Sequence, residues 1–362
     1  MPDMMRAMVL TGHGEMDRLV WTEDMPMPVP GLGQIRMRVL ACGLNNTDVN
    51  TRTGWYSKGV TGATTGGALT DAASNDAAWG GAPLTFPRIQ GADVCGRVDA
   101  VGQDVDPSLV GKRVLVDPWH YNPVAPEDPT QARYFGSEMD GGFAEYTVSQ
   151  TANVHPIECD LDDAELATFA TSWVTAENML NRAAVKAGDR VLITGASGGV
   201  GSALIQLAAR RGAEPIAMAA TAKADAVRQA GAAHVIDSRT ATLAQDLQEQ
   251  TGTAKVSVVA DIVGGALFTD LISVLVRGGR YTCAGAIAGP LVEMDLRTFY
   301  LNDLTFTGAT VVPPGTFADL VAYIARGEVK PMLAATYPLR ELHAAQTAFI
   351  EKNHVGNIVV IP

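Results

Sequence analysis

Residues 193–202 read ITGASGGVGS, with four glycines in ten positions. The apolar run VLIT immediately before the glycines predicts a strand that leads into the loop. After the glycines, apolar residues recur at the spacing of one buried helix face, at Val200, Leu204, Leu207 and Ala208. Backbone N–H groups in such a turn can approach a pyrophosphate closely at the N-terminus of the following helix. The order of strand, glycine-rich turn and helix therefore predicts a dinucleotide-binding unit. Ala196 replaces the first glycine of the usual G-x-G-x-x-G pattern, and the loop alone also fits a plain tight turn.

The pattern of predicted secondary structure changes near residue 164. Before it, short β-rich runs such as QIRMRVLACG (34–43) are separated by turn residues and predict a mostly-β region. After it, strand-like segments alternate with helix-like segments, as in DRVLITG (189–195) followed by VGSALIQLAARRG (200–212). This alternation is typical of βαβ units in a parallel, doubly wound sheet. We therefore expect an α/β fold in which a β-rich domain precedes a Rossmann-like domain.

The composition excludes several classes of protein. The chain has 362 residues, 47% of them apolar and 18% charged, which is typical of a globular protein of about two domains. No apolar run approaches the ~20 residues of a bilayer span, and the first residues lack the pattern of a secretory signal, so we expect no membrane association and a cytoplasmic location. A formal net charge of −12 without a basic cluster argues against nucleic acid and favours a small-molecule partner. The four cysteines contain no CxxC pair.

The end of the second strand of the Rossmann-like region bears on the choice of dinucleotide. An NAD-selective site places Asp or Glu there, about 20 residues past the glycines, to accept the ribose 2′-hydroxyl. The stretch IAMAATAKAD (216–225) has no acid before Asp225, and Lys223 lies two residues earlier. A lysine beside an uncharged strand end admits a 2′-phosphate, with Ser238 and Arg239 as further donors, so we expect NADPH rather than NADH. In the alternative interpretation, Lys223 lies on the exposed face of a helix.

Six stretches, in order along nearly the whole chain, resemble the medium-chain dehydrogenase/reductase superfamily, in particular its zinc-independent quinone oxidoreductase branch. They are ACGLNNTDV (41–49), FPRIQGADVCGRVDAVG (86–102), GGFAEYTV (141–148), the loop and helix at 193–207, GAAHVID (231–237) and RGGRYTCAGAIAG (277–289). The resemblance implies a GroES-like β-rich catalytic domain made from residues 1–153 and 301–362, around a Rossmann NADP-binding domain at 154–300. It also implies an oxidoreductase.

The resemblance also allows us to ask whether this chain has the residues that bind zinc in relatives. The zinc-dependent branch of the superfamily takes its catalytic ligands from three positions that hold Asn45, Ala92 and Thr171 in this chain. Alanine cannot coordinate a metal, and amide and hydroxyl oxygens are poor ligands for Zn²⁺. The lobe that binds structural zinc in that branch would fall near residues 118–140, which contain no cysteine. We therefore expect no metal, and hydride transfer to an acceptor that is already electron-poor, a quinone or an α,β-unsaturated carbonyl compound.

The resemblance suggests three catalytic residues. Asn45 would line the hydride site, or else only hold its own loop. Tyr56 matches a tyrosine that quinone oxidoreductases present to the substrate and is the best candidate acid, although packing in a β-rich domain would also explain it. Thr47 takes the place of a proton-relaying hydroxyl, or contacts the nicotinamide ribose. Asn50 stands where relatives often carry Tyr or His, and we expect Asp48 to act through the fold.

Cofactor contacts follow from the same resemblance. Thr175 would lie beside the nicotinamide, and Val263 and Gly264 would touch ribose. Backbone N–H groups would hold the pyrophosphate at Ser197, Gly198, Gly199 and Val200. Backbone groups would face the carboxamide at Ala284, Gly285 and Ala286. Two positions depart from the family pattern, because Asn357 replaces a frequent basic residue and Ser238 a frequent tyrosine, which leaves recognition of a 2′-phosphate mainly to Lys223.

Residues 57–83 form a long stretch rich in Gly, Ala, Thr and Asp, which predicts either a functional lid or a disordered loop. Aromatic residues that could line an apolar pocket, or pack in the core, are Trp55, Trp79, Phe135 and Trp173. Strands expected at 279–285 and 304–310 would leave an exposed sheet edge, so we expect a homodimer.

Two other functions stay open. The chain could be a zinc-type alcohol dehydrogenase with ligands that the pattern does not reveal. It could also be a non-catalytic NADPH-binding sensor or structural relative, which the unusual segment at 57–83 and Asn50 leave possible.

Overall fold

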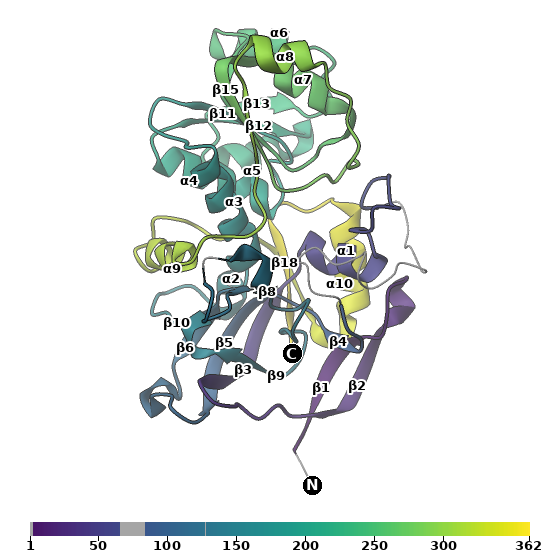
Figure 1. Cartoon of the computed structure of the whole chain (residues 1–362), viewed down its shortest axis with the longest axis vertical. Helices are drawn as coiled ribbons and strands as arrows, with labels where there is room; N and C mark the ends of the chain where they lie inside the picture. The colour runs from purple at the N-terminus through teal and green to yellow at the C-terminus, as the bar shows by residue number, and fades with distance from the viewer. Residues whose placement is uncertain (1–2, 66–83, 127) are drawn as a thin grey trace. The chain divides into compact units, whose positions relative to one another are not determined.

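The computed structural model describes residues 3–65, 84–126 and 128–362 (Figure 1). Among these residues the chain forms two compact units, which we describe separately. The first comprises 3–60, 84–171 and 314–362 apart from residue 127, and the second comprises 61–65 and 172–313. Trp79 and most of the stretch at 57–83 lie outside the described residues. No helix in the described part of the chain is both long enough and apolar enough to cross a bilayer.

The first unit is built on antiparallel sheets. Its main path of strands is β10 (Val154–Pro156), β6 (Arg113–Val116), β5 (Asp93–Val101), β3 (Gln34–Gly43), β18 (Asn357–Ile361) and β17 (Leu333–Pro338), with β9 (Tyr146–Gln150) also paired to β3. A second sheet joins β2 (Leu19–Pro26), β1 (Met4–Leu10) and β4 (Arg88–Ile89), and a third joins β7 (Trp119–His120) and β8 (Arg133–Tyr134). Because β18 pairs with β3, the C-terminal tail completes the sheet that the N-terminal segment begins.

Short helices connect and cover these strands. The α-helices are α1 (Asn46–Thr53), α2 (Asp163–Leu166), α9 (Thr316–Ala325) and α10 (Leu342–Glu351), and the 3₁₀ helices are η1 (Met16–Arg18), η2 (Pro107–Leu109), η3 (Pro129–Gln131), η4 (Thr151–Asn153) and η7 (Leu339–Glu341). The core includes Leu10 of β1, Ile35 of β3 and Val98 of β5, together with Phe143, and buried residues alternate along β3 at Ile35, Met37 and Val39. This alternation is the period of a half-buried strand.

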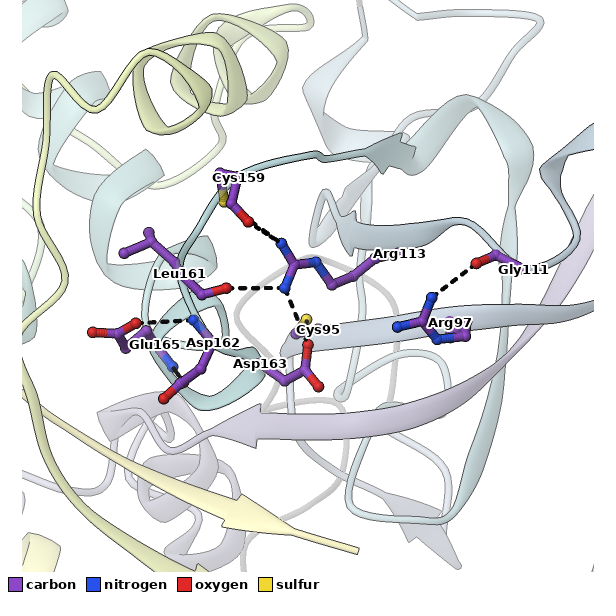
Figure 2. Close-up of polar contacts among 9 residues, drawn as sticks. All are labelled: Cys95, Arg97, Gly111, Arg113, Cys159, Leu161, Asp162, Asp163 and Glu165. Atoms are coloured by element: carbon purple, nitrogen blue, oxygen red, sulfur yellow. Dashed lines mark hydrogen bonds and ion pairs between the residues drawn. The ribbon is translucent and has the colours of Figure 1, made fainter.

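Arg113 of β6 fastens the segment that leads into α2, as Figure 2 shows. Its guanidinium donates to the carbonyl oxygens of Cys159 at 2.7 Å and Leu161 at 2.9 Å, and its Nη1 lies 3.5 Å from the Asp163 carboxylate. Asp162 and Glu165 exchange backbone-to-carboxylate hydrogen bonds of 2.9 and 2.7 Å, which is the reciprocal pattern of a capping box. These contacts fix the chain just before it reaches Thr171.

The second unit is a six-stranded, wholly parallel sheet with helices along the chain between its strands. Its strands, in spatial order, are β13 (His234–Asp237), β12 (Glu214–Ala219), β11 (Arg190–Ile193), β14 (Val256–Asp261), β15 (Leu275–Cys283) and β16 (Thr305–Gly308). Its helices are α3 (Ala170–Arg182), which begins at the end of the first unit, α4 (Gly199–Arg210), η5 (Thr221–Lys223), α5 (Ala224–Gln229), α6 (Leu243–Thr251), η6 (Gly265–Leu267), α7 (Phe268–Ser273) and α8 (Leu296–Leu301). The predicted α/β class with a doubly wound parallel sheet is confirmed.

Burial explains why the strands of this sheet read as continuous apolar runs. Val191, Leu192 and Ile193 of β11 are all fully buried, because helices cover both faces of a parallel sheet. Phe135 of the first unit and Trp173 of the second are buried as well. Phe135 stacks on His120, with ring centroids 5.7 Å apart, so it packs inside its own unit.

Candidate functional site

The candidate catalytic residues begin where β3 gives way to α1. Asn45 caps α1 in an extended conformation, and its backbone N–H donates to the Asp48 carboxylate at 2.8 Å. The same carboxylate accepts the Gly91 N–H at 3.3 Å, and the Gln90 side-chain amide donates to the Asp48 carbonyl oxygen at 3.0 Å. Asp48 therefore joins the start of α1 to the segment just before β5.

A second buried carboxyl group, Asp93, lies at the start of β5. Its Oδ1 accepts the Thr171 N–H at 2.7 Å and, at a very short distance, the Thr171 hydroxyl. The Tyr134 hydroxyl lies 2.6 Å from the Thr171 Oγ1, and the Asn45 side chain is close enough to Asp93 to lower the pKa of its carboxyl group. We call these four residues, Asn45, Asp93, Tyr134 and Thr171, the Asp93 cluster. Asn45 and Thr171 of this cluster occupy two of the three positions at which the resemblance places metal ligands. Asp93 directly follows Ala92, which occupies the third.

Both carboxyl groups are fully buried, and burial raises their pKa values. The pKa of Asp48 rises to about 7 against the opposing hydrogen bonds from Asn45 and Gly91. The pKa of Asp93 rises to about 6, again because of burial, with hydrogen bonds from Asn45 and Thr171 acting in the opposite direction. No Lys, Arg or His in the described part of the chain forms an ion pair with either group. One proton can therefore be held in this region at neutral pH.

Tyr56 and Thr47 lie close to the same helix. Burial of the Tyr56 hydroxyl raises its pKa well above the ordinary value, and the Asn50 side chain hydrogen-bonds to it. The Tyr56 ring meets Trp55 edge to face, with centroids 5.7 Å apart. The Thr47 Oγ1 and the Asn50 Oδ1 are buried and have no hydrogen-bond partner among the residues that the structure describes. Buried polar atoms in proteins are usually hydrogen-bonded, and a bound ligand or water could satisfy these two.

The residues at the three metal-ligand positions do not fit a zinc ion. Ala92 offers no donor atom, and the hydroxyl of Thr171 is engaged with Asp93 and Tyr134. Within the described ranges, no three His, Cys, Asp or Glu side chains gather as a metal would require. The only charged group in the Asp93 cluster is one carboxyl, which accepts hydrogen bonds from Thr171. Zinc prefers thiolate, imidazole and carboxylate ligands in a tetrahedral set.

The glycine-rich turn of the second unit fits a dinucleotide. β11 ends at Ile193, the turn follows, and α4 begins at Gly199. Gly195 has a φ of 57°, in the left-handed region that favours glycine. A Cβ on Gly201 would lie 2.3 Å from the Gly195 carbonyl oxygen, so only glycine lets α4 approach the turn this closely. The N–H groups at the start of this helix of 12 residues can hold the pyrophosphate.

Asp261, at the end of β14, orders the loop that follows this strand, which contains the predicted ribose contacts. Its carboxylate accepts the N–H groups of Val263 at 2.8 Å and Gly264 at 3.2 Å. It also accepts the hydroxyl groups of Thr194 and Tyr281, each at 2.6 Å. Val263 and Gly264 are predicted from the sequence, but Asp261 is not. An acid as the last residue of an apolar strand that is otherwise buried, VSVVAD, is the signal that could have revealed it.

The loop after β15 lies against the loop after β14. The Ala288 N–H donates to the Val263 carbonyl oxygen at 2.8 Å, and a Cβ on Gly264 would lie 3.3 Å from the Ala286 Cβ. The structure thus brings the predicted ribose residues together with the predicted carboxamide residues Ala284, Gly285 and Ala286. Thr175 lies in α3 of the same unit, whereas Asn357 is the first residue of β18 in the other unit.

An acid that the sequence did not predict, Asp237 of β13, lies beside the end of β12. Ala219 and Asp237 are register partners at the carboxyl ends of β12 and β13, and the Thr221 hydroxyl donates to the Asp237 carboxylate at 2.5 Å. The Ser238 N–H donates to the Ala219 carbonyl oxygen at 3.0 Å. Lys223 is half-buried, and burial lowers its pKa. The second strand of this unit has no acid at its end, as predicted, but Asp237 reaches the same edge of the sheet from the third strand.

A hollow of 440 Å³ lies elsewhere in the first unit, beside the residues of Figure 2. Its lining comprises Arg97, Gly111, Lys112, Arg113, Pro156, Ile157, Glu158 and Cys159. None of the candidate catalytic or cofactor residues lines it.

Comparison with known proteins agrees with the geometry. Residues 31–159 match the alcohol dehydrogenase GroES-like domain family, and residues 199–326 match the family described as zinc-binding dehydrogenase. A putative alcohol dehydrogenase of Sinorhizobium meliloti 1021 is 44% identical in its crystal structure, with all of this chain and 98% of that chain covered and a TM-score of 0.92.

Two curated relatives are more distant. Human quinone oxidoreductase is 26% identical over 96% of this chain and 94% of its own length. The acryloyl-coenzyme A reductase of Sulfurisphaera tokodaii is 25% identical over 99% of this chain and all of its own length. With a GroES-like unit, a parallel Rossmann-like unit and these relatives along its whole length, the chain belongs to the medium-chain dehydrogenase/reductase superfamily of oxidoreductases.

Proposed function

We propose that this protein is an NADPH-dependent reductase that transfers hydride to a quinone or an α,β-unsaturated carbonyl compound without a bound metal. The observation that carries the proposal is the Asp93 cluster. At the positions where zinc-dependent members hold their ligands, this chain has hydrogen-bonding groups and an alanine that cannot bind a metal. Two relatives, the human quinone oxidoreductase and the acryloyl-coenzyme A reductase, carry names that denote reactions of this class.

The second unit would hold the cofactor, which supplies hydride from its nicotinamide ring. The turn at Ser197–Val200 offers backbone N–H groups to the pyrophosphate. The loops that begin at Val263 and Ala284 offer backbone groups to ribose and carboxamide. Thr175 would contact the nicotinamide.

The first unit would bind the acceptor with neutral donors. A quinone or enone takes hydride directly when a hydrogen-bond donor stabilises the charge that develops on its oxygen. Asn45, Thr47 and Tyr56 are the donors that the sequence analysis assigned to this role. The buried Oγ1 of Thr47, which has no partner among the described residues, supports a ligand or water beside α1.

The preference for NADPH depends on a balance of charges at the end of β12. Lys223 favours a 2′-phosphate, and the Arg239 backbone N–H donates to Asp237 at 2.9 Å. Asp237 itself is exposed and negatively charged, because hydrogen bonds from Thr221 and Arg239 lower its pKa, so it opposes a phosphate nearby. We propose that Lys223 prevails. Replacement of Lys223 by alanine would then weaken NADPH binding more than NADH binding.

One prediction concerns both the turnover of the purified protein and its metal content. Purified protein should oxidise NADPH with quinones or enones as acceptors, contain far less than one zinc per chain, and keep its rate after dialysis against a chelator, because no residue set in the cluster fits zinc. The measurements are metal analysis and the decay of NADPH absorbance across an acceptor panel. One zinc per chain, with turnover lost to chelator and restored by zinc, would instead support an alcohol dehydrogenase. NADPH binding without turnover on any acceptor would support a sensor.

The second prediction concerns assembly, which we propose is a homodimer. β16 is the last strand of its sheet, and nearby large apolar side chains are exposed, with Leu296, Tyr300 and Leu301 of α8 at 66%, 60% and 55%. An exposed apolar patch beside a strand edge marks an interface. Light scattering should give a dimer, and the double variant Leu296→Glu/Tyr300→Glu should give a monomer. Val124→Glu, a control at a side chain 89% exposed in the other unit, should stay dimeric.

A further inference from the structure

The hollow of the first unit, beside the residues of Figure 2, gathers positive charge in a chain that is acidic as a whole. Its lining includes three cationic side chains, Arg97, Lys112 and Arg113, against the single acid Glu158. The lining therefore carries a formal charge of +2, whereas the whole chain carries −12. No candidate catalytic or cofactor residue belongs to this lining, so the proposed function does not explain its charge.

Two of the three cations face each other across neighbouring strands. Arg97 of β5 and Arg113 of β6 are register partners in an antiparallel pair. Directly opposed residues point to the same face of a sheet, with Cβ atoms about 4.5–5.5 Å apart, and like charges at such positions repel. Asp163 lies 3.5 Å from the Arg113 Nη1, but Arg97 has no ion pair in the described part of the chain. An anion between the two guanidinium groups would replace this repulsion by attraction.

Neutral acceptors hold both guanidinium groups in place. The Arg97 Nη1 donates to the Gly111 carbonyl oxygen at 2.9 Å, and Arg113 donates to the carbonyl oxygens of Cys159 and Leu161 (Figure 2). A carbonyl oxygen orients a guanidinium group without cancelling its charge, and Arg97 keeps its Nε and Nη2 donors for a further partner. Side chains that are already ordered lose less entropy when a ligand binds, so both arginines are prepared for an anion.

The acid of the lining does not neutralise the hollow. Glu158 lies 3.5 Å from the Lys112 Nζ, and the two side chains are 88% and 51% exposed. Exposed ion pairs of this kind are weak, because water screens them and two long side chains must be held in one geometry. Lys112 can therefore turn to a more highly charged anion while Glu158 moves into solvent. Pro156 and Ile157 add apolar surface to the same lining.

We propose that this hollow binds a small phosphate monoester, whose phosphoryl oxygens meet Arg97, Lys112 and Arg113. A phosphate monoester carries a charge of about −1.5 to −2 at pH 7, which matches the charge of the lining. Its three terminal oxygens can meet three cations from different directions, whereas the two coplanar oxygens of a carboxylate suit a single arginine.

The volume of the hollow favours an ester over a free phosphate ion. At 440 Å³ it lies in the range of small-molecule pockets, about 300–1,000 Å³, and leaves room for an organic group against Pro156 and Ile157. The proposal does not rest on hydride transfer, because none of these residues is assigned to the cofactor or the acceptor.

Calorimetric titration of the full chain with glycerol 3-phosphate, at low ionic strength in a buffer free of phosphate, tests the proposal. The double variant Arg97→Gln/Lys112→Gln should weaken binding by about 10- to 100-fold, because it removes hydrogen bonds from charged donors. Glu158→Gln should tighten binding by about 2- to 5-fold, because it removes the one opposing charge. Arg340→Gln, at an exposed arginine of η7 in the same unit, is the matched control and should bind as the wild type does.

The combination of a weaker and a tighter variant distinguishes a binding effect from a folding effect, since a misfolded variant gains no affinity. Titrations with inorganic phosphate and with succinate, a dicarboxylate without phosphoryl oxygens, test the chemistry of the ligand, and both should bind at least about 5-fold more weakly than the ester. Three results would each overturn the proposal. They are no binding of the ester, equal affinity in the double variant and the wild type, as expected for binding at the glycine-rich turn, and equal affinity for the ester and either of the other two anions.

Discussion

Gly201→Ala should weaken NADPH binding by about 10- to 100-fold. The added Cβ would lie 2.3 Å from the Gly195 carbonyl oxygen and 2.5 Å from the Ala196 Cα, both backbone atoms that cannot rotate away. To make room, α4 must move from the turn, and the N–H groups that would face the pyrophosphate move with it. Overpacking of this kind costs about 1–3 kcal/mol, and each 1.4 kcal/mol is about tenfold in the dissociation constant.

Titration of NADPH by fluorescence, below the unfolding temperature of each variant, measures the effect. Gly308→Ala is the matched control, because it adds the same methyl group in the same unit where nothing lies within 4 Å. It should bind NADPH as the wild type does. If Gly201→Ala binds as tightly as Gly308→Ala, the turn does not hold the cofactor as proposed.

The glycine-rich turn was predictable because its requirements are local. The strand, the glycines and the apolar face of α4 occupy consecutive residues, so their order in the sequence is also their order in space. The structure adds the reason for the last glycine, since Gly201 meets the turn that begins six residues earlier at Gly195. The α/β class was predictable for the same reason, because each βαβ unit repeats a local pattern.

The Asp93 cluster was not predictable in this way. Thr171 and Asp93 are 78 positions apart, and Thr171 and Tyr134 are 37 apart. The resemblance marked the positions of Asn45 and Thr171 as those of absent ligands, but nothing local in the stretch around Tyr134 indicates that its hydroxyl reaches Thr171. Asp237 escaped notice for a similar reason, because it reaches the edge of β12 from the neighbouring strand.

Asp261→Ala should destabilise the second unit by about 3–5 kcal/mol. The substitution leaves four donors without their acceptor, namely the buried hydroxyl groups of Thr194 and Tyr281, the buried N–H group of Gly264 and the partly buried N–H group of Val263. Each unsatisfied buried donor costs about 1–3 kcal/mol, and local rearrangement recovers part of the sum. Since whole domains are stable by only about 5–15 kcal/mol, the loss is a large share of the total.

The function should respond as strongly as the stability. Without the carboxylate, the backbone at Val263 and Gly264 loses the acceptor that orders it, so NADPH affinity should fall even in protein that remains folded. Urea unfolding followed by circular dichroism gives the free energy, and NADPH titration gives the affinity. Asp270→Ala, an exposed acid in α7 of the same unit, is the control and should cost less than about 1 kcal/mol. Equal unfolding curves for the two variants would show that Asp261 does not hold this loop, and the ribose contacts assigned to it would then lose their structural basis.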